Sequence, residues 1–320
     1  MNILIVSGFL GAGKTTFIKE LIRRTGTNPV ILENEYGDNS IDAQELRSSD
    51  SGSDKKGKLE VLEFMEGCVC CTMKDSFVNS VLTVFSGLSP EYLIVEPTGV
   101  GQLSKIIDNL KPILHENIRL LQPVAIVAPR SYRQNMSEWE VLYKDQIANA
   151  GTIVFSKCEN DSPELLSQTE SEIREINADA EIVSRHYTSQ SEEWWRNILS
   201  LPSSDVSAKA AEGKLESFSQ ITINNAKLDN PAELIVLLED CLRGSLGNIV
   251  RAKGTIPVGS ETLRFDLADS LYSITSSDQE ANQCVFIGES LNKDDIIRRL
   301  GSTPQMPKWN APNLSGKSRL

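Results

Sequence analysis

The chain has 320 residues, of which 40% are hydrophobic and 24% charged, and this composition is typical of a globular chain with about two domains. Its 44 acidic residues outnumber 32 basic ones, which leaves a formal net charge of −12. This balance argues against a nucleic-acid binder, because such proteins neutralise phosphates with Lys and Arg. No apolar run reaches the ~18 residues of a membrane span, and no basic flank of a signal peptide precedes the first apolar run. We expect a cytoplasmic protein with neither nucleic acid nor membrane as partner.

From residue 1 to about 200, short β-branched apolar runs alternate with longer amphipathic segments. This order predicts an α/β domain with a mainly parallel sheet flanked by helices. The expected strands are Ile3–Ser7, Val30–Glu33, Val61–Phe64, Tyr92–Glu96, Val124–Val127, Ile153–Ser156 and Ala180–Val183. The expected helices are Lys14–Arg24, Lys74–Phe85, Leu103–Leu110, Glu138–Asn149 and Pro163–Ile176. We assign residues 1–202 to this domain.

A polar stretch at 203–215 is predicted to be a linker, because it is rich in Ser, Ala and Lys and lacks an apolar period. Residues 216–301 then predict a smaller α+β domain with helices on one face of a mainly antiparallel sheet. Its expected elements are the strands Phe218–Ile223, Asn248–Gly254, Leu263–Ala268, Leu271–Thr275 and Val285–Gly288 and the helices Pro231–Leu242 and Lys293–Leu300. Residues 302–320, rich in Pro, Ser and Asn, are expected to form a disordered tail.

The first predicted strand runs directly into Gly8-Phe9-Leu10-Gly11-Ala12-Gly13-Lys14-Thr15 and then into a helix, so both the pattern and its context predict a Walker A loop. Such a loop turns its backbone N–H groups toward the phosphates of a nucleotide, its lysine reaches the β- and γ-phosphates, and its Thr hydroxyl is offered to Mg²⁺. The alternative is a glycine-rich turn between strand and helix that binds no nucleotide. The predicted nucleotide-binding residues here are Gly8, Gly11, Ala12, Gly13, Lys14, Thr15 and Thr16, with Lys14 also catalytic.

The strand Tyr92–Glu96 delivers an acidic residue to the carboxyl edge of the sheet and is followed by Pro97-Thr98-Gly99. Glu96 is therefore a predicted catalytic residue that binds Mg²⁺ or positions water, and the spacing leaves these two roles, as well as a plain surface charge, open. Gly99 is predicted to approach the γ-phosphate through its N–H and to begin a segment that moves on hydrolysis.

A base-reading loop is expected after a late strand, where the chain has Ser156-Lys157-Cys158-Glu159. The guanine-selective pattern is Asn-Lys-x-Asp, so Ser156 and Glu159 both depart from it. We predict that Lys157 covers the base and that Glu159 accepts the guanine N–H donors. Relaxed or adenine specificity is the alternative.

Three cysteines lie together in Gly67-Cys68-Val69-Cys70-Cys71. Thiolates at this spacing can converge on one transition metal and leave a fourth position open, which suits a carrier that releases its metal. A buried apolar cluster and a redox-sensing thiol set are the alternatives.

An acidic loop after the second strand contains Glu35 and Asp42. We list Glu35 as a candidate ligand of the thiol-bound metal and Asp42 as a candidate Mg²⁺ ligand, with a solvated loop as the alternative. Cys241 and Cys284 fall in apolar patterns and are expected in the core.

In chain order, the Walker A loop, Asn34-Glu35-Tyr36-Gly37, Gly67–Cys71 and Glu96-Pro97-Thr98-Gly99 resemble the CobW-type metallochaperone GTPases, which are relatives of HypB and UreG. Val250-Arg251-Ala252-Lys253-Gly254 is similar to the Arg-x-Lys-Gly strand of the CobW C-terminal domain. The resemblance implies GTP binding at Gly11–Thr16, a role of Glu96 in the Mg²⁺ and switch region, and a transition metal on Cys68, Cys70 and Cys71.

We therefore expect a P-loop GTPase that couples its GTP or GDP state to delivery of a transition metal to a client metalloprotein or metallocofactor enzyme. Zn²⁺ and Co²⁺ are the favoured metals, and Ni²⁺ is a further candidate. The alternative is a nucleotide-dependent redox or regulatory switch with a structural metal and no delivery. The sequence names neither the client nor the oligomeric state, for which a homodimer is one option.

Overall fold

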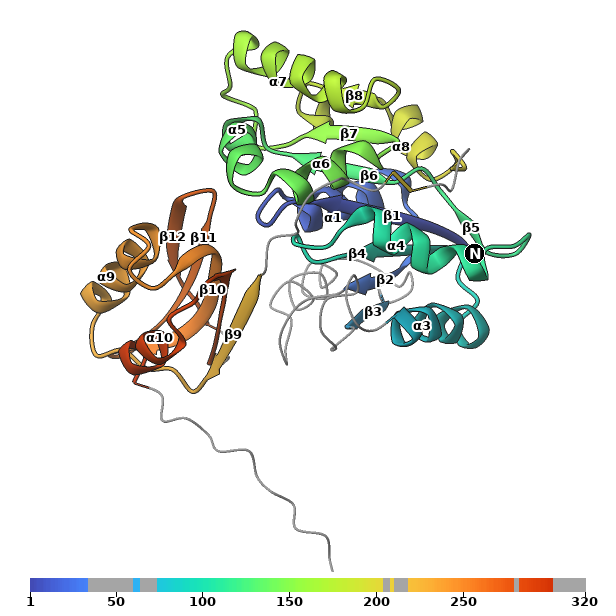
Figure 1. Cartoon of the computed structure of the whole chain (residues 1–320). Coiled ribbons are helices and arrows are strands. Elements are labelled where there is room, and N and C mark those ends of the chain that lie inside the picture. Colours follow the sequence, from blue (N-terminus) through green and yellow to red (C-terminus); the bar gives the residue numbers. More distant parts are fainter. Residues whose placement is uncertain (34–59, 64–73, 204–207, 210–217, 279–281, 302–320) are drawn as a thin grey trace, which may run out of the picture.

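The computed structural model describes residues 1–33, 60–63, 74–203, 208–209, 218–278 and 282–301 (Figure 1). The predicted linker falls almost entirely outside these residues, and so does the predicted tail. No helix among the described residues is both long and apolar enough to cross a membrane.

The first domain is built on a parallel sheet whose strand order is β3-β2-β4-β1-β6-β7-β8, with β5 also paired to β1. Alternate residues of a strand point to opposite faces, and in β1 Ile3 and Ile5 enter one buried cluster while Leu4 and Val6 enter another. The sheet is therefore buried on both faces. Its strands are β1 (Asn2–Gly8), β2 (Val30–Glu33), β3 (Glu60–Glu63), β4 (Tyr92–Glu96), β5 (Arg119–Leu120), β6 (Val124–Val127), β7 (Thr152–Phe155) and β8 (Glu181–Val183).

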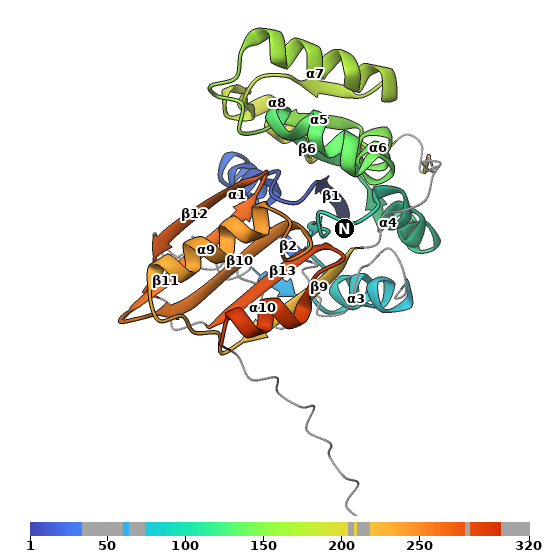
Figure 2. The same cartoon turned by 60° about the vertical axis from the view of Figure 1, so that its left-hand side comes forward.

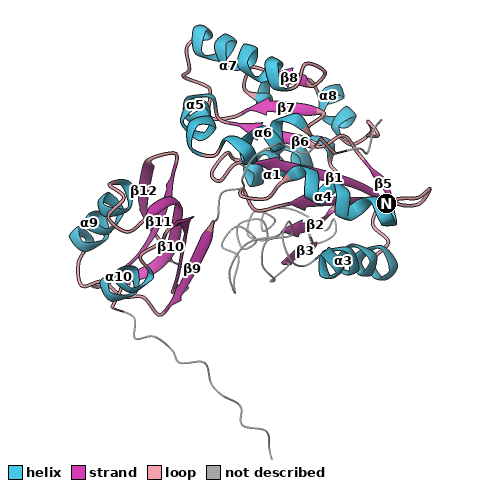
Figure 3. Cartoon of the chain, in the orientation of Figure 1, coloured by secondary structure: helices cyan, strands magenta, loops and turns pink. Residues whose placement is uncertain are grey.

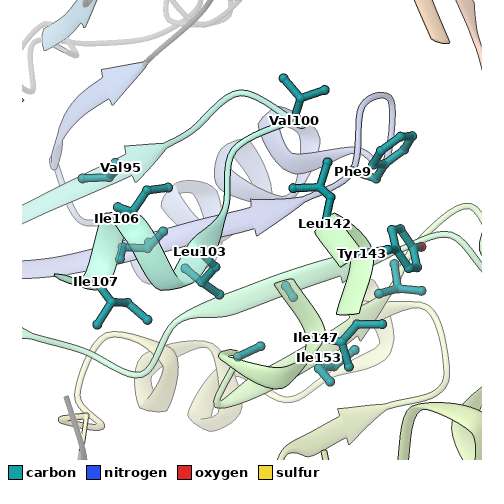
Figure 4. Close-up of a cluster of buried hydrophobic side chains, with 14 of the residues drawn as sticks. Phe9, Val95, Val100, Leu103, Ile106, Ile107, Leu142, Tyr143, Ile147 and Ile153 are labelled. Carbon is teal, nitrogen blue, oxygen red and sulfur yellow. The ribbon is translucent and has the colours of Figure 1, made fainter. Parts of the chain in front are cut away.

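Helices cover the two faces of this sheet (Figure 3). One face carries α1 (Lys14–Thr25) and α8 (Glu192–Ile198), which bury Phe17 and Trp195 in the same cluster. The other face packs on apolar side chains that Figure 4 shows gathered from β4, α4, α6 and β7. The helices of this second face are α3 (Lys74–Gly87), α4 (Leu103–Leu110), α5 (Pro129–Glu138), α6 (Glu140–Ala148) and α7 (Pro163–Ile176). The domain also contains two 3₁₀ turns, η1 (Lys111–Ile113) and η2 (Tyr187–Ser189).

The predicted helix Glu138–Asn149 corresponds to α6, which spans Glu140–Ala148. The helix before it, α5, was not predicted. It ends at Glu138, and Trp139 separates the two helices, with a buried side chain and a φ of −133° that is not helical. The sequence pattern missed α5 because this helix is mostly polar. Its Pro129 at the first turn is nevertheless a helix-start signal.

The second domain is a five-stranded antiparallel sheet of order β12-β11-β10-β13-β9. Its helices cover one face, where α9 contributes Leu234 and α10 contributes Ile296 to a single core that also buries Cys241 and Cys284. The predicted α+β class and the core position of both cysteines are confirmed. The elements are β9 (Ser219–Asn224), α9 (Pro231–Leu242), β10 (Asn248–Val258), β11 (Glu261–Ala268), β12 (Leu271–Ser276), β13 (Gln283–Glu289) and α10 (Lys293–Arg299).

The face of the second sheet that α9 and α10 leave uncovered is turned toward the first domain (Figures 1 and 2). Val285 and Ile287 of β13 belong to the buried cluster of the first domain. The rings of Trp139 and Phe218 also meet across the boundary, with centroids 4.5 Å apart. The two domains are thus joined by an apolar contact, which leaves the neighbouring polar residues of β10 and β11 beside the carboxyl ends of the first sheet.

Candidate functional site

A cavity of about 650 Å³ lies at the carboxyl ends of β1 and β4. In an open parallel sheet, ligands bind in this position. The first domain contributes the Walker A loop, the segment after β4 and the loop after β7, and the second domain contributes residues of β10, β11 and β12. Eight of the residues that the sequence analysis predicts at the nucleotide line this cavity. They are Gly11, Gly13, Lys14, Thr15, Thr16, Glu96, Gly99 and Lys157.

The Walker A loop has the backbone that its glycines allow. Gly8, Gly11 and Gly13 all have positive φ, and a Cβ on Gly8 would lie 2.5 Å from the carbonyl oxygen of Ile126. Gly13 caps α1 without a side-chain hydrogen bond, so the first N–H groups of the helix face the cavity. The Lys14 ammonium donates to the carbonyl oxygens of Gly8 (3.1 Å) and Phe9 (3.2 Å). This arrangement presents fixed N–H dipoles and a cation to an anionic ligand.

Thr15 and Glu96 meet in the cavity although 81 positions separate them in the sequence. The Thr15 hydroxyl donates to Glu96 Oε1 over 2.7 Å, and Glu96 is only 5% exposed. A hydroxyl and a carboxylate form the kind of oxygen donor set that Mg²⁺ prefers. The residues present therefore fit a Mg²⁺ ion beside the phosphate loop.

The segment after β4 packs directly on the Walker A loop. A Cβ on Gly99 would lie 2.3 Å from the backbone nitrogen of Leu10, so no side chain fits at this position without a shift of the loop. Gln146 of α6 holds the segment by donating to the carbonyl oxygens of Gly99 and Gly101, at 3.1 Å each. The hydroxyl of Thr98 is buried without a hydrogen-bond partner among the described residues. Sequence reasoning missed Gln146, which lies on a helix without any motif.

The loop after β7 is tied to the Walker A loop by Ser156. Its hydroxyl donates to the carbonyl oxygen of Ala12 over 2.6 Å and is buried. Lys157 follows with a positive φ of 54° and lines the cavity. Ser156, which departs from the guanine-selective pattern, thus has a structural role in joining the two loops.

Glu159 is turned toward the loop after β8, where its carboxylate lies 3.0 Å from Nε2 of His186. Its side chain is 57% exposed and is not among the residues that line the cavity. Cys158 is buried, and this burial raises the pKa of its thiol, which disfavours the thiolate form needed for metal binding.

The second domain closes one side of the cavity. Measured from a Cβ built on Gly11, Ala268 Cβ lies at 2.6 Å and Arg251 Nη1 at 3.4 Å. Asp269 pairs with the Lys157 ammonium at 2.8 Å. These contacts place β10 and the end of β11 against both the Walker A loop and the loop after β7. No sequence pattern predicted this contact between the domains.

The predicted transition-metal residues Cys68, Cys70 and Cys71 lie outside the described residues, and so do Glu35 and Asp42. Elsewhere, in the described part of the chain, no group of three His, Cys, Asp or Glu side chains is placed to hold a metal ion. The strands that lead into the undescribed segments, β2 and β3, are adjacent in the sheet. The strands β2 and β3 run parallel and therefore end at the same edge of the sheet.

Two family models match the chain. "CobW/HypB/UreG, nucleotide-binding domain" matches residues 2–184, and "Cobalamin synthesis protein cobW C-terminal domain" matches residues 218–303. Among curated proteins, the zinc chaperone YeiR of Escherichia coli is 33% identical over 163 residues, which cover 50% of this chain and 47% of YeiR. The zinc chaperone YjiA of the same organism is 24% identical over 318 residues, which cover 92% of this chain and 96% of YjiA.

The chain thus spans about half the length of YeiR. The solved structure of Zn(II)-bound YjiA GTPase from E. coli superposes with a TM-score of 0.46 at 18% identity and covers 94% of this chain and 98% of that one. The first family model covers more than half of the chain. This protein belongs to the CobW/HypB/UreG family of P-loop proteins and carries a CobW C-terminal domain.

Proposed function

We propose that this protein is a GTP-hydrolysing metallochaperone. It binds GTP and Mg²⁺ in the cavity between its two domains and couples the nucleotide state to the handling of a transition metal, with zinc the favoured cargo. The observation that carries the proposal is the pairing of Thr15 with Glu96 in the cavity that Lys14 also lines. It joins a phosphate-binding loop to an acidic strand end within one cavity.

In this proposal each residue has a separate task. The N–H groups of the loop from Gly8 to Thr16 hold the phosphates, and the Lys14 ammonium exchanges its two carbonyl acceptors for β- and γ-phosphate oxygens. Mg²⁺, held by Thr15 and Glu96, supplies positive charge at the β- and γ-phosphates. The N–H of Gly99 approaches the γ-phosphate, so the segment that Gln146 holds reports whether that phosphate is present.

Lys157 and Glu159 are proposed to read the base. The loop position of Lys157 beside the cavity supports its part. Glu159 would have to release His186 before it could accept the N–H donors of guanine. We therefore propose preference for GTP, with the strictness over ATP set by this exchange.

The metal is proposed to bind at Cys68, Cys70 and Cys71, with Glu35 as a further ligand and Asp42 as a further Mg²⁺ ligand. The zinc-chaperone relatives support zinc as cargo, and the cysteine spacing supports thiolate coordination. We also propose the domain boundaries 1–202 and 216–301, which the two family matches support by ending at 184 and starting at 218.

The proposal is tested with the purified full chain and its Lys14→Ala variant. GTP and ATP turnover are measured with and without stoichiometric Zn²⁺, and Zn²⁺ affinity is measured in the GDP state and with a non-hydrolysable GTP analogue. We expect GTP turnover that Lys14→Ala abolishes and a Zn²⁺ affinity that differs between the nucleotide states, because linkage requires such a difference if nucleotide drives release. Equal Zn²⁺ affinity in both states would exclude nucleotide-driven delivery, and absence of GTP turnover would exclude the hydrolase.

A further inference from the structure

We propose that Arg251 of the second domain is a catalytic residue of the first domain's nucleotide site, where it stabilises the charge that develops on the phosphates during hydrolysis. This inference rests on the proposed GTP hydrolysis and adds to it a cation that comes from the other domain of the same chain.

The position of Arg251 is the first argument. Its Nη1 lies 3.4 Å from a Cβ built on Gly11, in the middle of the Walker A loop. The loop's N–H groups and Lys14 surround the β- and γ-phosphates when a nucleotide is bound. A guanidinium in contact with this loop, on the wall of the same cavity, is within reach of those phosphates.

The hydrogen bonds of Arg251 leave donors available. Among the described residues its carboxylate partner is Asp266 of β11, whose Oδ2 accepts from Nη2 at 3.2 Å. A guanidinium carries five N–H donors in a planar fork, so the Nη1 that faces Gly11 is not used by this pair. Asp266, which also lines the cavity, orients the guanidinium through Nη2 and leaves Nη1 for an anion.

The burial of Arg251 strengthens the electrostatic attraction between its guanidinium and a phosphate. The Arg251 side chain is only 14% exposed, so its field is less screened by water than that of a surface arginine. Arginine stays protonated in proteins and matches phosphate oxygens bidentately. A charge held in place before the reaction needs no reorganisation as the transition state forms.

The local backbone directs Arg251 to this face. The pairing of β10 with β13 is irregular between Ile249 and Arg251, where the register shifts by one residue on one strand only. Ile249 therefore packs into the second domain's own core, as Ala252 does on the other side of the shift, while Arg251 lies on the opposite face. Bulges of this kind redirect side chains and occur next to active sites.

Two further contacts hold the strands in place. Ala268 packs against Gly11, and Asp269 pairs with Lys157. The turn after β11 is thereby fixed to both loops that enclose the nucleotide. The second domain is consequently positioned to deliver Arg251 in cis, without another protein.

The chemical step is the ordinary hydrolysis of the terminal phosphate. Water attacks the γ-phosphorus, the bond from that phosphorus to the β–γ bridging oxygen breaks, and its electron pair leaves with GDP. One proton of the water stays on the attacking oxygen and the other passes to a γ-phosphate oxygen, so that inorganic phosphate carries both as H₂PO₄⁻. Arg251 donates hydrogen bonds to the bridging and γ-phosphate oxygens as negative charge shifts between them, and is unchanged at the end.

The test compares full-length wild type with Arg251→Ala, Arg251→Lys and Arg243→Ala. Arg243 is an exposed control at the end of α9, paired with Glu239. We expect Arg251→Ala to lower kcat for GTP by about 10²- to 10³-fold, as loss of one preorganised donor does. Arg251→Lys should recover part of this loss because it keeps the charge but not the fork. Arg243→Ala should match wild type.

Binding supplies a readout that does not depend on turnover. GDP with aluminium fluoride resembles the phosphoryl group in transfer, and a residue that acts in the transition state favours such analogues over the ground state. Arg251→Ala should weaken binding of GDP–aluminium fluoride at least about tenfold and leave GDP affinity unchanged. Asp266→Asn should give a smaller loss of the same kind, because it acts by positioning Arg251.

Three results overturn the inference. Wild-type kcat and aluminium fluoride affinity in a folded Arg251→Ala protein would make the residue a plain domain contact. Equal weakening of GDP and GDP–aluminium fluoride would make it a ground-state ligand. If Arg251→Ala does not fold, wild-type kcat and aluminium fluoride affinity in Arg251→Lys and Asp266→Asn decide against the inference.

A wild-type protein that turns over no GTP removes the proposed function itself, whereas turnover that is insensitive to Arg251 removes this inference alone.

Discussion

The Ser156 hydroxyl donates a 2.6 Å hydrogen bond to the carbonyl oxygen of Ala12 and so ties the loop after β7 to the Walker A loop. Both groups are buried, and the bond spans 144 positions of the sequence. The two loops that would hold the base and the phosphates of one nucleotide are therefore fixed relative to each other before any ligand arrives.

Removal of this bond should weaken nucleotide binding. Ser156→Ala leaves the Ala12 carbonyl without its donor, at a cost of about 1 kcal/mol, which corresponds to roughly a five-fold loss of affinity for GDP if the loops separate. Ser171→Ala, on the exposed side of α7, is the matched control. Titration of both variants with a fluorescent GDP analogue checks the prediction, and equal affinities would contradict it.

Gly99 should tolerate no side chain. Gly99→Ala places a Cβ 2.3 Å from the Leu10 nitrogen, so the Walker A loop or the segment after β4 must move. We expect GTP turnover to fall at least about tenfold, since displacements of about 1 Å at an active site are costly. Gly87→Ala at the end of α3 is the control, because nothing lies within 4 Å of its new Cβ. Wild-type turnover of Gly99→Ala would show that the close approach has no part in the reaction.

The cysteines should divide into two groups. Alanine at Cys70 and Cys71 is expected to abolish stoichiometric Zn²⁺ binding, because two of three predicted thiolates are lost. Alanine at Cys241 should leave Zn²⁺ stoichiometry unchanged, because this residue is buried in the second domain's core and burial raises its thiol pKa to about 12. Metal analysis after equilibrium dialysis distinguishes the groups. Full stoichiometry in the Cys70 and Cys71 variant would refute the proposed metal site.

The stabilisation that the ionised Glu20 carboxylate gives to the folded protein should be lost in acid. Hydrogen bonds from Arg23, and further ones from Arg24, lower the pKa of Glu20 from 4.5 to about 2. Because the folded-state pKa lies below the unfolded one, this stabilisation is complete above about pH 5 and is lost as the pH falls toward 2. Its size should be about 1 kcal/mol, since the carboxylate is partly exposed.

Urea unfolding of wild type and Glu20→Gln between pH 7 and pH 3 measures this contribution. The difference in unfolding free energy between the two proteins should shrink as the pH falls. A difference that stays constant over this range would mean that the Glu20 carboxylate does not contribute through its charge.

Local patterns were sufficient for most elements of this protein. The strands Val30–Glu33, Tyr92–Glu96 and Val124–Val127 and the helices Leu103–Leu110, Pro163–Ile176 and Pro231–Leu242 have the predicted bounds. Ser162 caps its helix by accepting from the N–H of Leu165. Such signals succeed because hydrophobic period, caps and turn residues act within a few positions of the chain. The helix α5 is mostly polar and was missed, because it lacks the apolar period of the other helices.

The sequence by itself therefore determined the two fold classes, the Walker A loop and the acidic end of β4, because each depends on residues that are neighbours in the chain. Only the tertiary structure decided that Gln146 holds the segment after β4, that Ser156 ties two loops together and that Arg251 reaches Gly11 from another domain. These relationships join residues 45 to 240 positions apart in the sequence. Sheet order and domain packing, which no local pattern specifies, bring them together.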